Sequence, residues 1–469
     1  MSRPNILFIL ADDLGWGDVS CHGSPIRTPN IDRLMKQGVE LGQHYVQPMC
    51  TPTRASLLSG RYPSRFGPHA TVPSNRPVFP DGYQTLAAVL RDSGYDTGLF
   101  GKWHLGATQN HGPNEFGFNY SYGSRTGGVD PYTHRYRNGV YSFPWHRNGK
   151  NVDEQGHVTD LIINEALSWI ECREDPWFCY GPFTAVHVPV KSTHEWLDEY
   201  AFETFDADPL KDASFKRYAG YASHMDHAIG QLLESLEKTN QRDNTIIIFS
   251  SDNGSIGSAP LHASDVYPGW QEDSPRLGSN LPLRGYKAQL YEGGMRTPTL
   301  INWRGNLEPG RMDHPVHVSD WMPTLLNLLN IDPPTDPKWD GLDIWPLISG
   351  TEETPDRREI YWNFRAGKGF GFRSGDWKLI SSAGQGMPGV YEEYSTSESS
   401  KGRTLELFNL ADDPYETKEI SGTEKEKVEE LLNKIEEEFE KDYTDKRPDL
   451  ENFPDPLNNT DNPRSFTPI

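Results

Sequence analysis

Four short, continuously apolar segments of this chain each end in polar or glycine-rich residues. They are NILFILADD (residues 5–13), GYDTGLFGKWHLG (94–106), PWFCYGPFTAVHVP (176–189) and NTIIIFSSDNGS (244–255). A strand that is apolar on both faces belongs to a sheet covered on both sides, whereas a half-exposed strand alternates polar and apolar residues. The pattern predicts a large, mostly parallel sheet buried inside an α/β domain.

Helical patterns lie between these segments. They are TPNIDRLMKQG (28–38), YQTLAAVLRDSG (83–94), VTDLIINEALSWIECRE (158–174) and YAGYASHMDHAIGQLLESLEKTN (218–240). Strands that alternate with helices indicate a sheet sandwiched by helices. Because ligands of such sheets bind beyond the carboxyl ends of the strands, we expect the four polar clusters to meet at one place.

The pattern changes after about residue 350. REIYWNF (358–364), GFGFRSGDWKLIS (369–381) and TLELFNLADDP (404–414) resemble antiparallel strands, and a charged helical pattern follows at 424–442. We therefore predict a large domain over residues 1–350 and a smaller C-terminal α+β domain with an antiparallel sheet over 351–442. Residues 443–469, rich in Pro, Asn and Asp, are predicted to form an extended arm.

Charge and hydropathy exclude some partners. The chain of 469 residues has 45 Lys and Arg against 67 Asp and Glu, a net charge of −22. Nucleic acid binding needs a basic surface, so no nucleic acid partner is expected. No apolar run is long enough for a membrane helix, so no membrane partner is expected either. An apolar run from residue 5 leaves no room for a signal peptide, which indicates either a cytoplasmic protein or a periplasmic or secreted one whose leader was removed.

Four cysteines, at positions 21, 50, 172 and 179, are too few for a disulfide framework in a chain of this length. Cys172 and Cys179 either pair or remain as two buried free thiols, and the spacing does not decide between these alternatives.

Acidic and amide side chains follow two of the predicted strands. Asp12 and Asp13 end the first segment, and Asp252 and Asn253 end the fourth. One such pair alone is as often a solvated turn as a site. Two sets at parallel strand ends favour a hard cation, because oxygen ligands suit Ca²⁺ or Mg²⁺ rather than zinc.

Cationic side chains stand at the same strand and loop ends. They are Arg54, Lys102, His104, His187 and Lys287. Beside a metal, this set fits a site for a tetrahedral oxyanion, in which histidines move protons during an in-line displacement. A lone histidine at a strand end is more often structural, so the interpretation depends on the whole set.

Cys50 is the candidate nucleophile, and it is a poor match for this site. Its position at a predicted helix start indicates a lowered pKa and a thiolate. A soft thiolate pairs badly with a hard metal, however, and the residues alone do not identify the nucleophile.

The motif around Cys50 resolves this difficulty by resemblance. Cys50-Thr51-Pro52-Thr53-Arg54, continued by ASLLSGRYPSR, is similar to the Cys/Ser-x-Pro-x-Arg signature of the type I sulfatases of the alkaline-phosphatase-like superfamily. NILFILADDLGWGDVSCHG, GKWHLG, FSSDNGS, LPLRGYKAQLYEGGMRTP and LFNLADDPYE resemble further family blocks in family order. Within the family, YGSRTGGVDPYTH and NLPLRGYKAQLYEGG look most similar to arylsulfatase B, the N-acetylgalactosamine-4-sulfatase, and to bacterial polysaccharide sulfatases.

The resemblance implies that a maturation enzyme oxidises Cys50 to formylglycine (3-oxoalanine), whose hydrate is the nucleophile. It also implies a Ca²⁺ site, with Mg²⁺ as an alternative, held by Asp12, Asp13, Asp252, Asn253 and the modified Cys50. A hydrate has a second hydroxyl, so the sulfated residue can release sulfate by breaking its C–O bond; a serine or thiol has none.

The resemblance assigns the remaining roles as well. Arg54 would orient the hydrate, Lys102 and Lys287 would bind sulfate oxygens, and His104 would take the proton of the second hydroxyl. His187 is the expected acid at the leaving oxygen, with Lys287 as an alternative donor.

Long loops near the expected site supply candidates for substrate binding. Arg125, Tyr132, His134 and Trp270 are residue types that stack on sugars or pair with anions. With the family blocks they favour a sulfated carbohydrate, such as a 4-sulfated galactose-type unit of a glycosaminoglycan or algal polysaccharide. The alternatives are a phosphatase, phosphodiesterase or phosphonate hydrolase of the same superfamily, and an inactive carbohydrate-binding protein.

Overall fold

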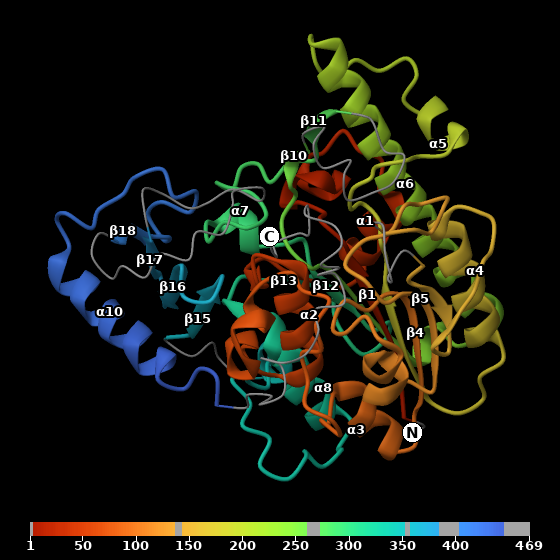
Figure 1. Ribbon diagram of the computed structural model, residues 1–469, viewed down its shortest axis with the longest axis horizontal. Helices are drawn as coiled ribbons and strands as arrows, with labels where there is room; N and C mark the ends of the chain where they lie inside the picture. Colours follow the sequence, from red (N-terminus) through yellow and green to blue (C-terminus); the bar gives the residue numbers. More distant parts are fainter. Residues whose placement is uncertain (1–2, 137–142, 260–272, 352–356, 384–402, 445–469) are drawn as a thin grey trace, which may run out of the picture.

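The structure is a computed structural model that describes residues 3–136, 143–259, 273–351, 357–383 and 403–444. Its largest element is a ten-stranded sheet in the order β13-β2-β12-β9-β1-β8-β4-β5-β6-β7 (Figure 1). From one edge to the other, its strands are β13 (Gly310–Met312), β2 (Val39–Leu41), β12 (Leu300–Asn302), β9 (Thr245–Ser251), β1 (Asn5–Ala11), β8 (Trp177–Pro182), β4 (Asp96–Lys102), β5 (Tyr120–Ser124), β6 (Trp145–Arg147) and β7 (Lys150–Asn151).

The centre of this sheet is parallel. β1 pairs in parallel with β8 and β9, and β4 pairs in parallel with β8 and β5, whereas β12, β6 and β7 pair antiparallel. The four apolar segments form β1, β4, β8 and β9. The prediction of a mixed, mostly parallel sheet is therefore confirmed.

Helices cover both faces of the sheet, as the alternation of patterns predicted (Figure 1). One face packs on α1 (Pro29–Lys36), α4 (Val158–Glu171) and α6 (Pro209–Lys238), and the other on α2 (Cys50–Ser59), α3 (Leu86–Asp92) and α8 (Trp321–Leu328). In β1, Leu7, Ile9 and Ala11 belong to the first apolar cluster, and Ile6, Phe8 and Leu10 belong to the second. Burial on both faces is why β1 has no polar residue between Asn5 and Asp12.

Shorter elements connect these layers. They are the strand pairs β3 (His44–Tyr45) with β14 (Val316–His317) and β10 (Gly257–Ala259) with β11 (Ser274–Leu277), the helices α5 (His194–Asp198), α7 (Glu292–Met295) and α9 (Trp345–Ile348), and short 3-10 helices such as Trp16–Asp18 and Pro63–Phe66.

A second, four-stranded antiparallel sheet follows in the C-terminal region, as predicted. It consists of β15 (Glu359–Phe364), β16 (Gly369–Ser374), β17 (Trp377–Ala383) and β18 (Arg403–Asn409). One face packs on α10 (Lys425–Phe439) through Val428, Leu431 and Ile435. The domain boundaries at 350 and 442 stay a prediction, and most of the predicted arm, from residue 445, lies outside the described residues.

The other face of the small sheet packs on the large domain (Figure 1). Trp362 of β15 is fully buried in this interface, and its Nε1 donates a hydrogen bond of 3.0 Å to the carbonyl of Val46. Ile360, Ile380 and Phe408 join it against Tyr45, Met49 and Met295. The small sheet is thus part of the support for the segment that precedes Cys50.

The cysteines remain as free thiols in the structure. Cys172 and Cys179 do not pair, and only Cys179 is buried, so the expectation of two buried thiols was wrong for Cys172. Cys172 is the exposed residue that directly follows the last residue of α4.

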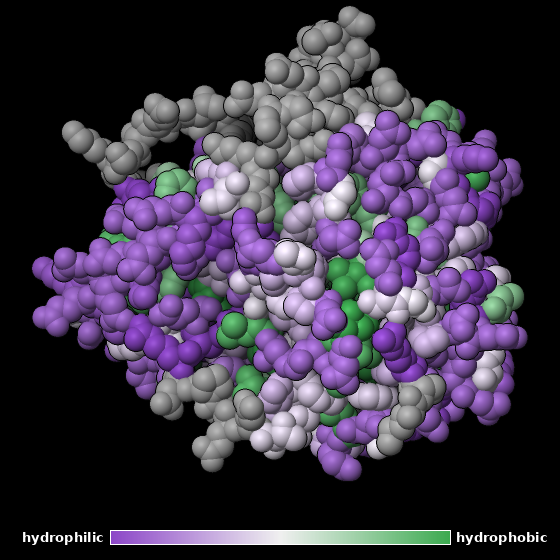
Figure 2. Space-filling model, turned by 90° about the horizontal axis from the view of Figure 1, so that it is seen from below, coloured by the Kyte–Doolittle hydropathy of each residue, from purple (hydrophilic) through white to green (hydrophobic). Residues whose placement is uncertain are grey.

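Among the described residues, none of the helices is both long and apolar enough to cross a membrane. Hydrophilic residues cover most of the face shown in Figure 2, in keeping with a chain in which 24% of residues are charged.

We expect Trp362→Ala to lower the free energy of unfolding by about 3–5 kcal/mol, because it leaves a cavity between the two sheets. Trp362→Phe retains a ring in the interface and should cost clearly less. Urea denaturation of both variants and the wild-type chain measures the difference. Equal stability of Trp362→Ala and wild type would contradict the proposed support by the small sheet.

Candidate active site

The polar clusters do meet, at the carboxyl ends of the parallel strands of the large sheet. β1 and β9 pair in parallel with Ala11 opposite Ser251, so the residues that follow each strand lie side by side. Asp12 and Asp13 therefore face Asp252 and Asn253, and Lys102 ends β4 nearby. The arrangement follows directly from the shared direction of the strands.

A tight turn directs both carboxylates of the first pair inward. Asp13 has a positive φ of 66°, in the left-handed region that aspartate tolerates better than most residues. Its backbone N–H donates to Oδ1 of Asp252 at 3.2 Å, and the N–H of Leu14 donates to the hydroxyl of Ser251 at 3.0 Å. The turn is thereby tied to the end of β9.

Three buried carboxylates each face a buried cation. The ion pairs are Lys102 Nζ with Asp12 Oδ2 at 2.7 Å, Lys287 Nζ with Asp13 Oδ1 at 2.6 Å, and Arg54 Nη2 with Asp252 Oδ2 at 2.8 Å. Unpaired charges in such an interior would be very costly, so the pairing is needed for this cluster to exist.

The pairing leaves three buried oxygens that accept no hydrogen bond. Within the described residues, Asp12 Oδ1, Asp13 Oδ2 and Asn253 Oδ1 have no hydrogen-bond donor. A buried acceptor that loses its hydration without replacement destabilises the fold, and oxygens are the ligands that Ca²⁺ and Mg²⁺ prefer. These three oxygens, together with the neighbouring carboxylate of Asp252, therefore fit a binding site for a hard cation.

Burial and neighbouring charges separate the pKa values of the two adjacent aspartates. Burial and the nearby Asp252 raise the pKa of Asp12 to about 8, against the opposing effect of Lys102. Burial also acts on Asp13, but Lys287 and other nearby cations outweigh it and hold the pKa of Asp13 below its usual value.

Cys50 is the first residue of α2 and lies beside these ion pairs, with 2% of its surface exposed. Burial raises the pKa of the Cys50 thiol even though Lys102 and Lys287 oppose the change. The prediction of a lowered pKa was wrong, because burial and the nearby carboxylates outweigh the helix start and the lysines. The encoded thiol is therefore a weak nucleophile here.

The rest of the Cys50 segment is held by side-chain hydrogen bonds. The Thr51 hydroxyl donates to the carbonyl of His104 at 3.2 Å, and the Thr53 hydroxyl donates to the carbonyl of Asp252 at 2.6 Å. Arg54, one helical turn after Cys50, donates to Asp252 and, through Nη1, to the carbonyl of Lys102 at 2.8 Å. Arg54 thus joins α2 to the ends of β4 and β9.

Two buried histidines complete the site. Burial and the nearby Lys102 and Arg54 hold the pKa of His104 well below its usual range, and its Nδ1 has no hydrogen-bond partner among the described residues. A β-carbon on Gly127 would lie 2.2 Å from His104 Nε2, so only glycine allows this close approach.

His187 follows β8 and contacts the aspartates from the other side. Its Nε2 lies 3.8 Å from Asp13 Oδ2, and its Nδ1 lies 2.6 Å from the carbonyl of Val188. Burial lowers the pKa of His187 to about 3, although Asp13 opposes the change. Because a carbonyl only accepts, the neutral ring donates from Nδ1 and carries its lone pair on Nε2.

The residues predicted to bind substrate differ from one another in burial and in contacts. Arg125 Nη1 donates to the carbonyl of Gly149 at 3.0 Å, and its own carbonyl accepts from the N–H of His104 at 3.3 Å. His134 stacks on Trp145 with ring centroids 5.0 Å apart. Both side chains are buried against protein groups, and their role in substrate binding stays a prediction.

Tyr132 is the exposed member of that set, with 44% of its surface accessible and its ring edge against His157. Trp270 lies outside the described residues.

A buried charge network that the sequence reasoning missed supports the Lys287 loop. Lys378 of β17 places Nζ 2.8 Å from Glu292 Oε1, at the start of α7, and 2.8 Å from Glu416 Oε1. Glu416 also accepts from the N–H of Glu292 at 2.6 Å. The only sequence signal was a lysine inside the apolar run WKLIS, which does not reveal a partner so distant in the chain.

Comparisons with known proteins agree with this geometry. The Sulfatase family model matches residues 4–331, and the model described as N-sulphoglucosamine sulphohydrolase, C-terminal, matches residues 286–445.

Among curated relatives, the chain is similar to N-acetylgalactosamine-6-sulfatase of Homo sapiens, with 33% identity over 74% of this chain and 66% of the relative. It is also similar to N-acetylgalactosamine-6-O-sulfatase of Bacteroides thetaiotaomicron, with 28% identity over 92% of this chain and 93% of the relative. Among solved structures, "Crystal structure of Ps i-CgsB in complex with k-i-k-neocarrahexaose" matches with a TM-score of 0.78 and 29% identity, covering 95% of this chain and 94% of that one.

We expect Lys378→Met to lower the free energy of unfolding by about 3–5 kcal/mol, because it leaves two buried carboxylates without their cation. Amide hydrogen exchange in residues 284–296 should also become faster, since Glu292 loses its partner. Urea denaturation and exchange mass spectrometry measure the two effects. Lys418→Met, at an exposed position, is the matched control, and unchanged exchange in Lys378→Met would contradict the supporting role.

Proposed function

We propose, from the premise that this chain belongs to the sulfatase family, that it removes sulfate from a sulfated carbohydrate by means of a formylglycine at position 50 and a bound Ca²⁺. Membership of the family makes the protein a sulfuric ester hydrolase. The observation that carries the finer proposal is the meeting of three unpartnered oxygens, two lysines and two histidines around buried Cys50.

The names of the relatives support a carbohydrate substrate. Two act on N-acetylgalactosamine 6-sulfate, and one solved structure contains a neocarrahexaose. We therefore propose a sulfated galactose-type unit of a glycosaminoglycan or algal polysaccharide. The 4-sulfate expected from the sequence stays a prediction, and the relatives make the 6-sulfate an equal candidate.

Asp12, Asp13, Asp252, Asn253 and the residue derived from Cys50 would hold the Ca²⁺. The cation would stabilise negative charge at the nucleophile and at the sulfate oxygens. The unpartnered oxygens of Asp12, Asp13 and Asn253 support this assignment, because they are the atoms that a hard cation would satisfy.

Formylglycine would supply a hydrated aldehyde, in which one hydroxyl can attack sulfur and the other can drive release of sulfate. The raised pKa of the Cys50 thiol supports this part of the proposal, since an unmodified thiol is a weak nucleophile in this environment. A maturation enzyme is therefore the expected protein partner.

The chain's own residues would bind sulfate and move protons. Lys102 and Lys287 would neutralise the sulfate oxygens, and the guanidinium of Arg54 would hold residue 50 in place. His104, whose Nδ1 has no partner among the described residues, would accept a proton from residue 50.

Two groups could protonate the leaving alcohol. His187 carries its lone pair on Nε2 and must gain a proton first, whereas Lys287 already carries one. We assign His187 as the acid because its Nε2 faces the aspartate cluster, and Lys287 remains the alternative donor.

Removing metal ions should destabilise the protein. Returning Ca²⁺ at 100 times its Kd should raise the free energy of unfolding by about 2.7 kcal/mol, since the cation binds the folded chain. Thermal unfolding of chelator-treated protein, with and without Ca²⁺, measures this gain. Asp13→Asn should lose most of it, and the exposed Asp198→Asn should retain it. No gain in the chelator-treated wild type would overturn the metal assignment.

Sulfate release from defined oligosaccharides tests the function as a whole. The panel contains 4-sulfated and 6-sulfated N-acetylgalactosamine units, carrageenan fragments and the corresponding phosphate esters, with enzyme produced in a host that makes formylglycine. We expect turnover of at least one sulfated sugar and far slower turnover of phosphates. Faster hydrolysis of the phosphate esters than of the sulfated sugars would refute the proposal that the protein is a carbohydrate sulfatase.

Cys50→Ser is the control for the nucleophile in that assay. It should retain the Ca²⁺ response and lose turnover by about 1,000-fold or more, the scale expected when a nucleophile is removed. Mass spectrometry of the peptide around position 50 establishes whether formylglycine is present in the active preparation. Wild-type turnover by Cys50→Ser would disprove the hydrate mechanism.

A further inference from the structure

A cavity of about 660 Å³ lies near the amino end of β9, whereas the candidate active site lies at the carboxyl end of that strand. Arg242 lies three residues before β9, whereas Asp252 follows the last residue of that strand. Seven residues of extended chain separate the two ends by roughly 20 Å or more. The cavity is lined by residues along α1, from Pro29 to Lys36, and by the segment before β9 and the turn after β12.

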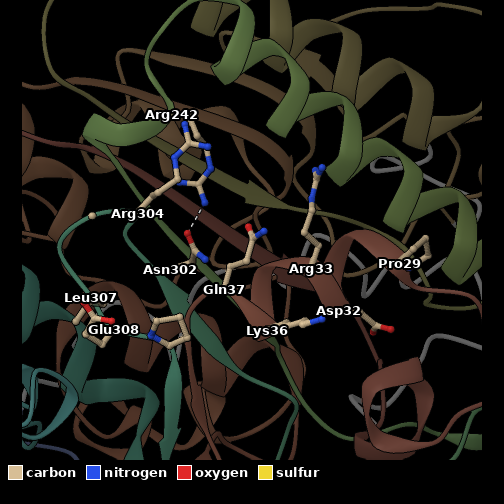
Figure 3. A pocket seen from close by; sticks show the side chains of 12 residues that line it. Pro29, Asp32, Arg33, Lys36, Gln37, Arg242, Asn302, Arg304, Leu307 and Glu308 are labelled. Carbon is tan, nitrogen blue, oxygen red and sulfur yellow. Dashed lines mark hydrogen bonds between the residues drawn. The ribbon is translucent and has the colours of Figure 1, made fainter.

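Arg242 lines one end of this cavity (Figure 3). It is only 4% exposed, and Nη2 donates to Oδ1 of buried Asn302. Nη1 has no hydrogen-bond partner, and no carboxylate of the described residues lies within ion-pair distance of the guanidinium. A buried cation in this state destabilises the fold unless an anion joins it.

Arg304 and Arg33 add positive charge around Arg242, and the carboxylates that offset it, Glu237 and Asp243, form their ion pairs with Arg304. Figure 3 shows Arg304 beside Arg242 at one end of the cavity, with the guanidinium of Arg33 extended toward the same end. Burial and then the charge of Arg304 lower the pKa of Arg242, whereas Glu237 and Asp243 oppose the change. Arg33 adds a smaller effect in the same direction as Arg304. Lys36, one helical turn after Arg33, also lines the cavity.

The acidic groups of this region are mostly engaged elsewhere. Asp32 accepts from the Ser20 hydroxyl at 2.7 Å and from the N–H of Cys21 at 3.0 Å. Glu237 and Asp243 form ion pairs with Arg304, and Glu308 is an exposed residue of the cavity wall. Among the described residues, these carboxylates leave Arg242 without an ion pair, which is unexpected in a chain with a net charge of −22.

We propose that this cavity is a second, non-catalytic site that binds a tetrahedral oxyanion, sulfate or phosphate, carried by a small molecule such as a sugar. Arg242 Nη1 would donate to the anion, and Arg33 and Lys36 would close over it from α1. The volume lies within the range of small-molecule sites, so a sugar ring fits beside the charged group. This inference does not depend on the reaction at Cys50.

Isothermal titration calorimetry with inorganic sulfate, at constant ionic strength and with the full chain, tests the proposal. Two binding events are expected, one at each site, and Lys287→Met should remove only the active-site event. The double variant Arg33→Gln/Lys36→Gln should weaken the other event at least tenfold. Its rate of sulfate-ester hydrolysis should equal that of the wild type, because both residues are exposed and lie far from Cys50.

A charge-matched control separates a built site from general electrostatics. Lys418→Gln/Lys425→Gln removes two exposed positive charges from the C-terminal region and should leave both binding events unchanged. Arg242→Gln should abolish the second event; if that variant does not fold, as judged by circular dichroism, the double variant decides. Unchanged sulfate affinity in Arg33→Gln/Lys36→Gln, or an equal loss in the control, would overturn the proposal.

Further titrations identify the source of the anion. Four anions, inorganic sulfate, inorganic phosphate, N-acetylgalactosamine 6-sulfate and glucose 6-phosphate, are compared in a Lys287→Met background, where only the cavity remains. Tighter binding of either sugar than of its inorganic ion supports use of the whole cavity and names the ester class. Failure of all four anions to bind in this background would refute the site.

Discussion

Three carboxylate–cation pairs, buried at the carboxyl edge of the large sheet, are the interaction on which the rest of the structure depends. Asp12, Asp13 and Asp252 are acceptable in the interior only because Lys102, Lys287 and Arg54 face them. The cations come from β4, the loop before α7 and α2, so the pairs also tie three distant segments to β1 and β9.

These pairs explain why the small C-terminal sheet is needed for a site it does not enter. The loop with Lys287 has no regular structure of its own, and Lys378 of the small sheet anchors it through Glu292. Trp362 in the same sheet packs below the segment that leads to Cys50. Residues of both sheets therefore help to position one set of charges.

The same requirement, that buried charged and polar atoms have partners, applies at both sites of the molecule. At the carboxyl edge of the sheet, the cations are matched by carboxylates and the unpartnered atoms are oxygens, which suits a cation. At the opposite edge, the unpartnered atom is a guanidinium nitrogen of Arg242, which suits an anion. In both places, the unsatisfied buried group indicates what is missing from the contacts of the chain itself.

Much of the fold and of the candidate site was predictable from local patterns. Continuous apolar runs predicted β1, β4, β8 and β9, because burial on both faces removes the polar residues from a strand. Parallel pairing then placed the residues after those strands together. The helix start at Cys50 was also evident, but its pKa was not, since burial depends on elements from the whole chain.

The sequence by itself determined which residue types stand at the strand ends and which family motif surrounds Cys50. Only the tertiary structure decided the partners: that Lys378 reaches Glu292, that Arg125 and His134 are held by neighbouring protein groups, and that Arg242 Nη1 has no hydrogen-bond partner among the described residues. The reason is physical. Strand and helix patterns are set by neighbours in the chain, whereas the energy of a buried charge depends on groups that meet only when the chain is folded.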